Sequence, residues 1–268
     1  DYRFCWIRDA SMIIDLFARI GHVIASENFM KFILGRMLLK SENISVMYGI
    51  NGERDIKEQV LKHLGGYEGS GPVRVGNAAY QQRQNDVYGE LIEAIYSYFV
   101  INAGNKEKFN EELWTVVRSL ANHVIEIWQE PDCGIWERRG AMRHFVHSKM
   151  MNWVALDRAA KIGRFVGKKQ NIGRYLKVAD EIKKDVLKNG WDQELNSFVM
   201  FYGSKDLDAS NLLMLHYGFL DAADPRIIAT VEASYQKLLR DGFVMRYTAE
   251  DEFGIPQNAF IVCTFWLV

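Results

Sequence analysis

Cysteine is scarce in this chain of 268 residues. Cys5, Cys133 and Cys263 are widely separated, and no two of them form a CxxC pair. Neither a disulfide framework nor a zinc site is therefore indicated. We expect a protein of a reducing compartment, the cytoplasm, and we expect no metal site.

An excess of charge of one sign is missing as well. The 33 Lys and Arg residues are balanced by 34 Asp and Glu residues, which leaves a formal net charge of −1. Such a chain has no bulk field that would attract nucleic acid or an anionic membrane. No uninterrupted run of about 18 apolar residues indicates a membrane span either. The partner that fits best is a neutral or weakly polar small molecule.

The two ends lack the usual start and stop signals. Asp1 has no preceding Met, no signal peptide follows it, and the last residues are the apolar run FIVCTFWLV without a cap. We interpret the chain as a piece of a longer polypeptide. Its length suffices for one large domain, and no low-complexity linker divides it.

Most of the chain shows the spacing of apolar residues that is typical of amphipathic helices. Gly21 can end the first helix in a left-handed turn, Asp208 is a good N-cap, and Pro225 suits the first position of a helix. A glycine-rich stretch over 40–76 lacks periodicity, and 197–202 alternates as in a small hairpin. The pattern predicts nine helices, at 10–20, 24–39, 85–102, 110–130, 148–162, 170–188, directly after 208, at 225–238 and from 259 onward.

Nine helices in sequential antiparallel pairs fit either an α-solenoid or a closed ring of helix hairpins. A solenoid would show a recurring consensus of about 34–45 residues, and none is visible. The loops rich in Trp, Arg and acidic residues fall between helix pairs, where a ring would gather them over its central funnel. The sequence therefore favours an all-α ring.

The loop PDCGIWERR at 131–139 is the strongest candidate for chemistry, because it places Glu137 directly after Trp136. A glycosidase needs a carboxylic acid that stays protonated near neutral pH, and an aromatic wall beside a carboxyl disfavours its anion. Trp136 is the candidate wall. Taken alone, the pair also fits a packed ring beside a solvated acid at the start of a helix.

Four segments together resemble glycoside hydrolase family 15, the glucoamylase-like enzymes that include glucodextranases and some trehalases. They are DYRFCWIRDA at 1–10, RVGNAAYQQRQNDVYGE at 74–90, the 131–139 loop with HSKMMNWVALDRA at 147–159, and RYTAEDEFGIPQNAFIVCTFW at 246–266. The resemblance implies an (α/α)6 barrel, the six-hairpin toroid. It also implies an inverting, exo-acting hydrolase that releases glucose from α-glucosides of an oligosaccharide or polysaccharide, without metal or cofactor.

The resemblance also assigns residues. The family's W-x-R-D motif matches Trp6, Arg8 and Asp9, where the Arg and the Asp hold glucose hydroxyls, as a guanidinium fork and a carboxylate can. An ion pair at a helix start is the alternative interpretation of the two charges when the family is left aside. The general acid matches Glu137. The expected substrate contacts are Trp6, Arg8, Asp9, Asp86, Trp136 and Arg246.

Two departures from the family matter. Arg138 and Arg139 follow the general acid where fungal members have a second acid, which puts the contacts to the leaving glucose in doubt. The family's general base lies in a loop beyond the equivalent of Val268. We therefore expect 1–268 to be one truncated catalytic domain, without its last helices and its N-terminal β-sandwich, and inactive by itself. The acidic run at 250–252 is the rival base within the chain.

Three alternatives remain open. The first is a trehalase of the same family, which would differ around the leaving glucose. The second is a sugar-binding toroid that has lost catalysis. The third, a terpenoid cyclase-like ring, would need aspartate-rich metal motifs or zinc ligands, and neither is visible. Linkage preference and oligomeric state are not indicated by the sequence.

Overall fold

The structure is a computed structural model that describes residues 3–37, 44–101, 109–251 and 254–268. Small parts of the expected elements lie outside these ranges. They are the end of the helix predicted at 24–39, residue 102 of the helix predicted at 85–102, and Glu252 of the acidic run.

Within the described ranges the chain is mainly helical, as predicted. Nine α-helices account for nearly half of the described residues, and a π-helical turn, Ser97–Ile101, directly continues the third. The helices are α1 Ile7–Arg19, α2 Val23–Met37, α3 Asp86–Tyr96, α4 Glu111–Ile127, α5 Val146–Phe165, α6 Ile172–Asn189, α7 Leu213–His216, α8 Pro225–Leu238 and α9 Ile261–Leu267.

Local signals in the sequence explain several helix ends. Gly21 has a φ of 83° directly after α1, a conformation that glycine adopts without steric cost. The Asn110 side chain accepts a hydrogen bond from the Leu113 amide and caps α4. Asp224 caps α8 in the same way through the Arg226 amide, and Pro225 occupies the first turn.

The end of α4 differs from the prediction, because the helix stops at Ile127 rather than near residue 130. Lys149, from the start of α5, donates through Nζ to the carbonyl oxygens of Trp128 and Glu130, the latter at 3.0 Å. A buried cation thus satisfies carbonyl groups that a longer helix would have paired internally. Its position 21 residues further along the chain hides this cap from a local reading.

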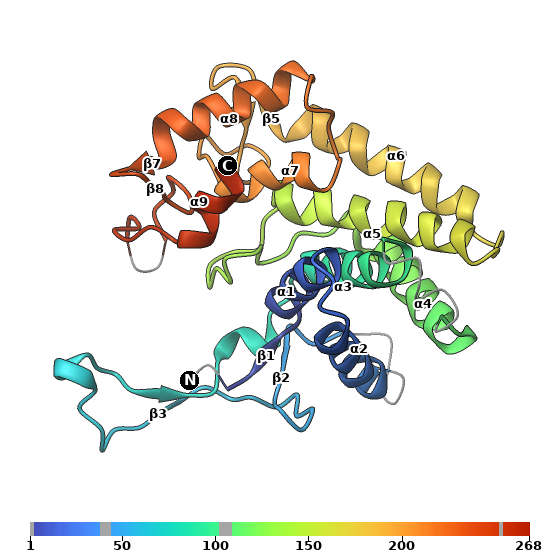
Figure 1. Ribbon diagram of the computed structural model, residues 1–268. Coiled ribbons are helices and arrows are strands. Elements are labelled where there is room, and N and C mark those ends of the chain that lie inside the picture. The colour runs from blue at the N-terminus through green and yellow to red at the C-terminus, as the bar shows by residue number, and fades with distance from the viewer. Residues whose placement is uncertain (1–2, 38–43, 102–108, 252–253) are drawn as a thin grey trace.

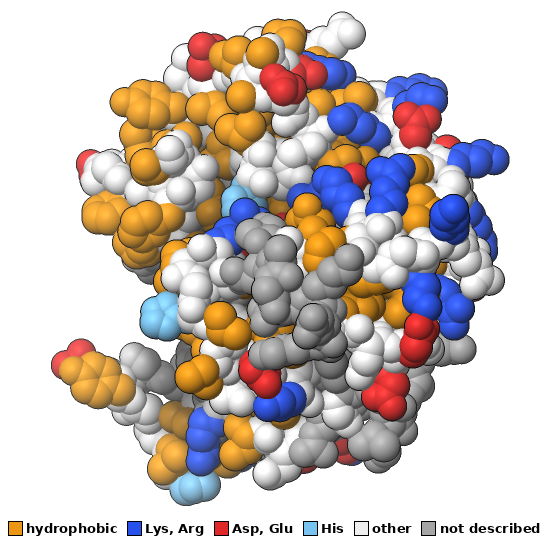
Figure 2. All heavy atoms as spheres, turned by 45° about the vertical axis from the view of Figure 1, so that its right-hand side comes forward, with side chains coloured by type: hydrophobic (Ala, Val, Ile, Leu, Met, Phe, Trp, Pro, Cys, Tyr) orange, Lys and Arg blue, Asp and Glu red, His pale blue; other side chains and the backbone are white. Residues whose placement is uncertain are grey.

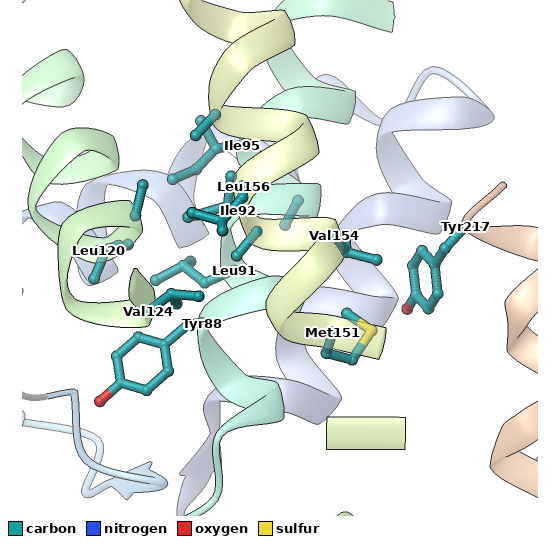
Figure 3. Packing of buried hydrophobic residues seen from close by; sticks show 14 of the residues in the cluster. Tyr88, Leu91, Ile92, Ile95, Leu120, Val124, Met151, Val154, Leu156 and Tyr217 are labelled. Atoms are coloured by element: carbon teal, nitrogen blue, oxygen red, sulfur yellow. The ribbon is translucent and has the colours of Figure 1, made fainter. Parts of the chain in front are cut away.

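The helices follow an arc in Figure 1, from α8 through α6 and α5 to α3, α1 and α2, with α4 beside α5 and α3. Within it α3 contacts α1 and α5 as well as α4, and every residue of 86–95 is buried. Gly89 allows the backbones of α3 and α5 to approach, since a Cβ there would lie 2.2 Å from the Met151 carbonyl oxygen. Figure 3 shows the apolar side chains that fill the space between α3, α4 and α5.

Strands are short and occur as four antiparallel two-stranded pairs in the described residues. A small hairpin was predicted within 197–202, but the pair β5–β6 spans 191–198, so only Ser197 and Phe198 of the predicted segment belong to it. The pair β1–β2 anchors the start of α1, because the Ile7 amide also donates to the Val46 carbonyl at 3.0 Å. The pairs are β1 Cys5–Trp6 with β2 Met47–Tyr48, β3 Gln59–Val60 with β4 Arg74–Val75, β5 Trp191–Asp192 with β6 Ser197–Phe198, and β7 Leu239–Arg240 with β8 Phe243–Val244.

Charges of both signs share the outer surface. In the face shown in Figure 2, Lys and Arg side chains are interspersed with Asp and Glu side chains. On α6, Lys184 pairs with Asp180 at 2.6 Å, four residues apart, which is the spacing that brings side chains together on a helix. Among the helices of the described residues, none combines the length and apolar character needed to cross a membrane.

Candidate active site

Three segments that are distant in the sequence converge beside the starts of α1 and α3. Arg8 lies in the first turn of α1, and Asp86 is the first residue of α3. Glu137 belongs to the loop that precedes α5, and its carboxylate reaches Arg8. The fold therefore brings Arg8 together with residues that lie 78 and 129 positions further along the chain.

Arg8 is the centre of this cluster. Its Nη1 atom lies 2.7 Å from Gln84 Oε1 and 3.4 Å from Asp86 Oδ2, and both partners are fully buried. Its Nη2 atom lies 3.4 Å from Asp9 Oδ2 and 3.5 Å from Glu137 Oε1. Burial lowers the pKa of Arg8, but the three carboxylates raise it by more, so the guanidinium stays charged.

The Glu137 carboxylate accepts a hydrogen bond from the Trp6 indole, with 2.8 Å between Nε1 and Oε1. The side chain is 23% exposed, which leaves it accessible to a substrate. Its backbone is unusual, because φ is 55° at a residue that is not glycine. That conformation costs roughly 1–2 kcal/mol and persists only where the surroundings hold it.

Trp136 faces away from the Glu137 carboxylate, contrary to the expected aromatic wall. Its indole N–H donates to both carboxylate oxygens of Asp208, at 3.1 and 3.0 Å, and its ring packs against Tyr247, Phe260 and Trp266. The left-handed backbone at Glu137 turns the two neighbouring side chains to different surroundings. The indole that contacts Glu137 is therefore that of Trp6.

Asp208 has the capping role that the sequence predicted. It begins the short 3₁₀ helix Ala209–Leu212 and accepts a hydrogen bond from the Ser210 amide at 2.8 Å. Burial raises its pKa to about 6, although the hydrogen bonds from Ser210 and Trp136 oppose that shift. The same carboxylate thus holds both a helix start and the indole of Trp136.

Arg246 belongs with Trp136 rather than with the Arg8 cluster. Its guanidinium carbon lies 5.9 Å from the Trp136 ring centre and 5.4 Å from that of Tyr247, which are cation–π distances. The predicted site residues therefore form two groups joined by the peptide bond between residues 136 and 137. Trp6, Arg8, Asp9, Asp86 and Glu137 make up the first, and Trp136 and Arg246 the second.

The two arginines after the general acid position fasten its loop to other segments. Arg138 Nη2 donates to the Glu250 carbonyl oxygen at 2.8 Å, and Arg139 Nη2 lies 2.9 Å from Glu58 Oε2. In the acidic run at 250–252, Asp251 accepts a hydrogen bond from the Tyr247 hydroxyl. That carboxylate is thus already engaged within its own segment.

Sequence reasoning missed several buried polar residues beneath the cluster. Tyr217 donates its hydroxyl hydrogen to Glu90 Oε2 at 2.8 Å, one helical turn after Asp86, and burial raises the pKa of Glu90 well above its usual range. Burial lowers the pKa of His147 to about 4 and raises that of Asp132 to about 7. The signal available for Glu90 is a charged residue flanked by the apolar residues of α3.

No role was predicted for the side chains of Gln82 and Gln84, although QQRQN is an unusual run of amides before a helix. Gln84 Nε2 donates to Gln82 Oε1 at 3.0 Å, and Gln82 Nε2 donates to the carbonyl oxygens of Glu137 and Arg138 at 3.1 and 3.2 Å. Within the described residues, no group of three His, Cys, Asp or Glu side chains is placed to hold a metal ion.

Comparison with known proteins agrees with this arrangement. The family model for glycosyl hydrolases family 15 matches residues 1–268. A trehalase from Mycolicibacterium smegmatis is 40% identical over 274 residues, covering 100% of this chain and 40% of that protein. A trehalase from Thermoplasma volcanium is 35% identical over 269 residues, covering 100% of this chain and 42% of that protein. The chain thus spans about two fifths of the length of these relatives.

Solved structures show the same fold at low sequence identity. A glycosidase variant in complex with glucose superimposes with a TM-score of 0.77 at 18% identity, over 99% of this chain and 68% of that one. A bacterial glucoamylase complexed with acarbose gives 0.67 at 17% identity, over 97% of this chain and 38% of that one. These neighbours confirm the predicted fold class, that of the (α/α)6 toroid.

Proposed function

Because the chain belongs to family 15 of the glycosyl hydrolases, we propose that it carries the acid side of the active site of a trehalase. Trehalose is a neutral disaccharide of two glucose units, which agrees with the balanced charge of the protein. The sequence favoured a glucoamylase and kept the trehalase as an alternative, and our proposal reverses that preference. Trehalases match the whole chain at 35–40% identity, whereas the likeness to glucoamylases, at 14–17%, supports the fold alone.

The observation that carries the proposal is the contact of Glu137 with Arg8 and Trp6. In our proposal Glu137 is the general acid that protonates the glycosidic oxygen as the bond breaks. Arg8 and Asp9 bind hydroxyl groups of one glucose unit through charge-assisted hydrogen bonds. The Asp9 side chain is 58% exposed and is open to such a partner, while the buried Asp86 holds the guanidinium in place.

An inverting hydrolase needs a second carboxylate about 6.5–9.5 Å from the acid, to activate the attacking water. We propose that it comes from sequence that the longer relatives contain and this chain does not. The same sequence would supply the remaining helices of a single catalytic domain. Asp251 is the weaker choice for the base, because the Tyr247 hydroxyl already donates to it.

The decisive experiment compares trehalose with maltose and starch as substrates of the full-length enzyme. We expect glucose release from trehalose to be fastest, and the variant Glu137→Gln to lower kcat by about 10²–10⁴-fold, since it cannot donate the proton. Faster release from maltose or starch would restore the glucoamylase interpretation. Tight sugar binding without any hydrolysis would instead indicate the non-catalytic toroid.

A further inference from the structure

We propose that Gln82 and Gln84 are positioning residues that aim the carboxyl group of Glu137. This inference rests on the proposed function, since it takes Glu137 as the general acid. Its basis is a continuous series of hydrogen bonds that runs through the side chains of Arg8, Gln84 and Gln82 and ends at two backbone carbonyl groups. Arg8 Nη1 donates to Gln84 Oε1 at 2.7 Å, Gln84 Nε2 to Gln82 Oε1 at 3.0 Å, and Gln82 Nε2 to the carbonyl oxygens of Glu137 and Arg138.

The segment 82–85 holds the loop 131–139, which carries Glu137 and is called the acid loop below, at three points. Besides the contact of Gln82, the Cys133 amide donates to the Arg83 carbonyl at 2.9 Å. The Asn85 amide donates to Asp132 Oδ2 at 2.8 Å. The first part of the loop is therefore held by amide groups of the backbone, whereas its tip is held by side chains, those of Gln82, Arg138 and Arg139.

The backbone at the tip of the loop needs contacts from other segments to keep its conformation. Glu137 has a φ of 55°, a conformation that a residue with a Cβ leaves readily when nothing opposes it. The Gln82 amide donates to the backbone carbonyl oxygens of Glu137 and of the next residue, Arg138, at 3.1 and 3.2 Å. Loss of this donor removes the contact closest to the left-handed backbone, although Arg138 and Arg139 still anchor the loop, and we expect the carboxyl group to be aimed less well at its place beside Arg8.

The chemistry of the amide explains why glutamine occupies both positions. Each side chain must accept a hydrogen bond through its oxygen and donate one through its nitrogen, which a carboxylate cannot do. Gln84 is only 2% exposed, so water does not readily replace its partners. The series begins at Arg8, the proposed sugar ligand, so the same residue fixes both the sugar and the acid loop.

The test separates proton donation from general damage by means of two substrates. Hydrolysis of trehalose expels a sugar alkoxide that must be protonated, whereas α-D-glucosyl fluoride expels fluoride without a proton. For Gln82→Met we expect kcat on trehalose to fall about 10–100-fold, with KM and the kcat on the fluoride within about 3-fold of wild type. Gln84→Glu, which keeps the acceptor for Arg8 but loses the donor, should behave similarly.

Gln81→Met is the matched control. Gln81 is exposed, and its amide donates to the hydroxyl of its neighbour Tyr80, so both substrates should react as in wild type. Unchanged turnover of trehalose by Gln82→Met, or an equal loss on both substrates, would overturn the positioning role and leave the proposed function intact. A wild-type enzyme that hydrolyses neither substrate would remove the proposed function, and this inference with it.

Discussion

Asp132 is a buried carboxyl at the start of the acid loop, 1% exposed, and its pKa is raised to about 7 by burial. An unfolded aspartate has an ordinary value near 3.8. Between about pH 4 and 7 the folded protein therefore keeps a proton that the unfolded chain releases. The contribution of Asp132 to stability is present below this window and is lost as the pH rises through it.

We expect the variant Asp132→Asn to gain stability relative to wild type as the pH rises from about 4 to 7. The asparagine imitates the protonated acid and still offers an oxygen to the Asn85 amide. The gain has an upper limit of about 4 kcal/mol, from a shift of roughly three pKa units at 1.36 kcal/mol each. Urea unfolding of both proteins at pH 4.5, 6 and 7.5 measures it. A constant difference across this range would contradict the prediction.

At the same scale, the sequence predicted part of the site and missed the rest for identifiable reasons. The W-x-R-D motif and Glu137 were predicted to meet, and Arg8 and Glu137 lie 3.5 Å apart. Trp136 was expected beside Glu137, but the left-handed φ between them could not be read from the residue types. The Gln82 contact joins residues 55 positions apart, a pairing that only the fold reveals.

At the scale of elements, the close contact between α3 and α5 is possible because Gly89 has no side chain. A Cβ at Gly89 would lie 2.2 Å from the Met151 carbonyl oxygen, and this backbone atom cannot rotate away. We expect Gly89→Ala to destabilise the protein, because overpacking costs about 1–3 kcal/mol and the better helix propensity of Ala returns only about 1. Thermal unfolding should show a melting temperature lowered by several degrees.

Gly173→Ala is the matched control for this change. Gly173 lies in the first turn of α6, and a Cβ at this position would have no neighbouring atom within 4 Å. At this position the change only replaces glycine by a residue of higher helix propensity, so the melting temperature should stay equal or rise. A Gly89→Ala protein as stable as this control would show that α3 and α5 can separate freely.

Helices were predicted well as elements and less well at their ends. Periodicity depends on nearby residues, so the nine α-helices of the described residues were all predicted, and Pro225 correctly indicated the start of α8. The end of α4 depends on Lys149 instead, a residue of another helix. Likewise, α3 passes into a π-helical turn at Ser97, whose hydroxyl donates to Asp15 of α1. Such contacts arise only after the helices have packed.

For the whole molecule, α1 presents apolar side chains that nothing in the described residues covers well. Ile13, Leu16 and Ile20 are 51, 54 and 59% exposed at helical spacing, and Phe265 of α9 is 73% exposed. In Figure 1, α1 lies beside α3 and α2, whereas α9 lies beside α7 and α8. This supports our proposal that further helices, from the sequence found in the longer relatives, complete the toroid against these faces.

The variant Leu16→Lys tests that proposal in two contexts. In the 268-residue chain we expect a change in unfolding free energy within about 0.5 kcal/mol, as for other exposed positions. In the full-length enzyme the same change should cost about 2 kcal/mol or more, because a charge would be buried against the added helices. Urea denaturation measures both values.

Ile228→Lys on α8, where Ile228 is 48% exposed, is the control expected to have the same small effect in both proteins. Equal costs for Leu16→Lys in the short and the long protein would mean that this face stays in water. The toroid would then have to be completed elsewhere.

The anchoring of the acid loop to the segment before α3 also bears on how enzymes of this shape can be recombined. A chimera that receives residues 131–139 from a relative, but keeps its own 82–85, would acquire the proton donor without the partners that orient it. The two stretches should therefore be inherited as one unit, although α3 and α4 separate them along the chain. Natural variation and laboratory shuffling alike should exchange them together.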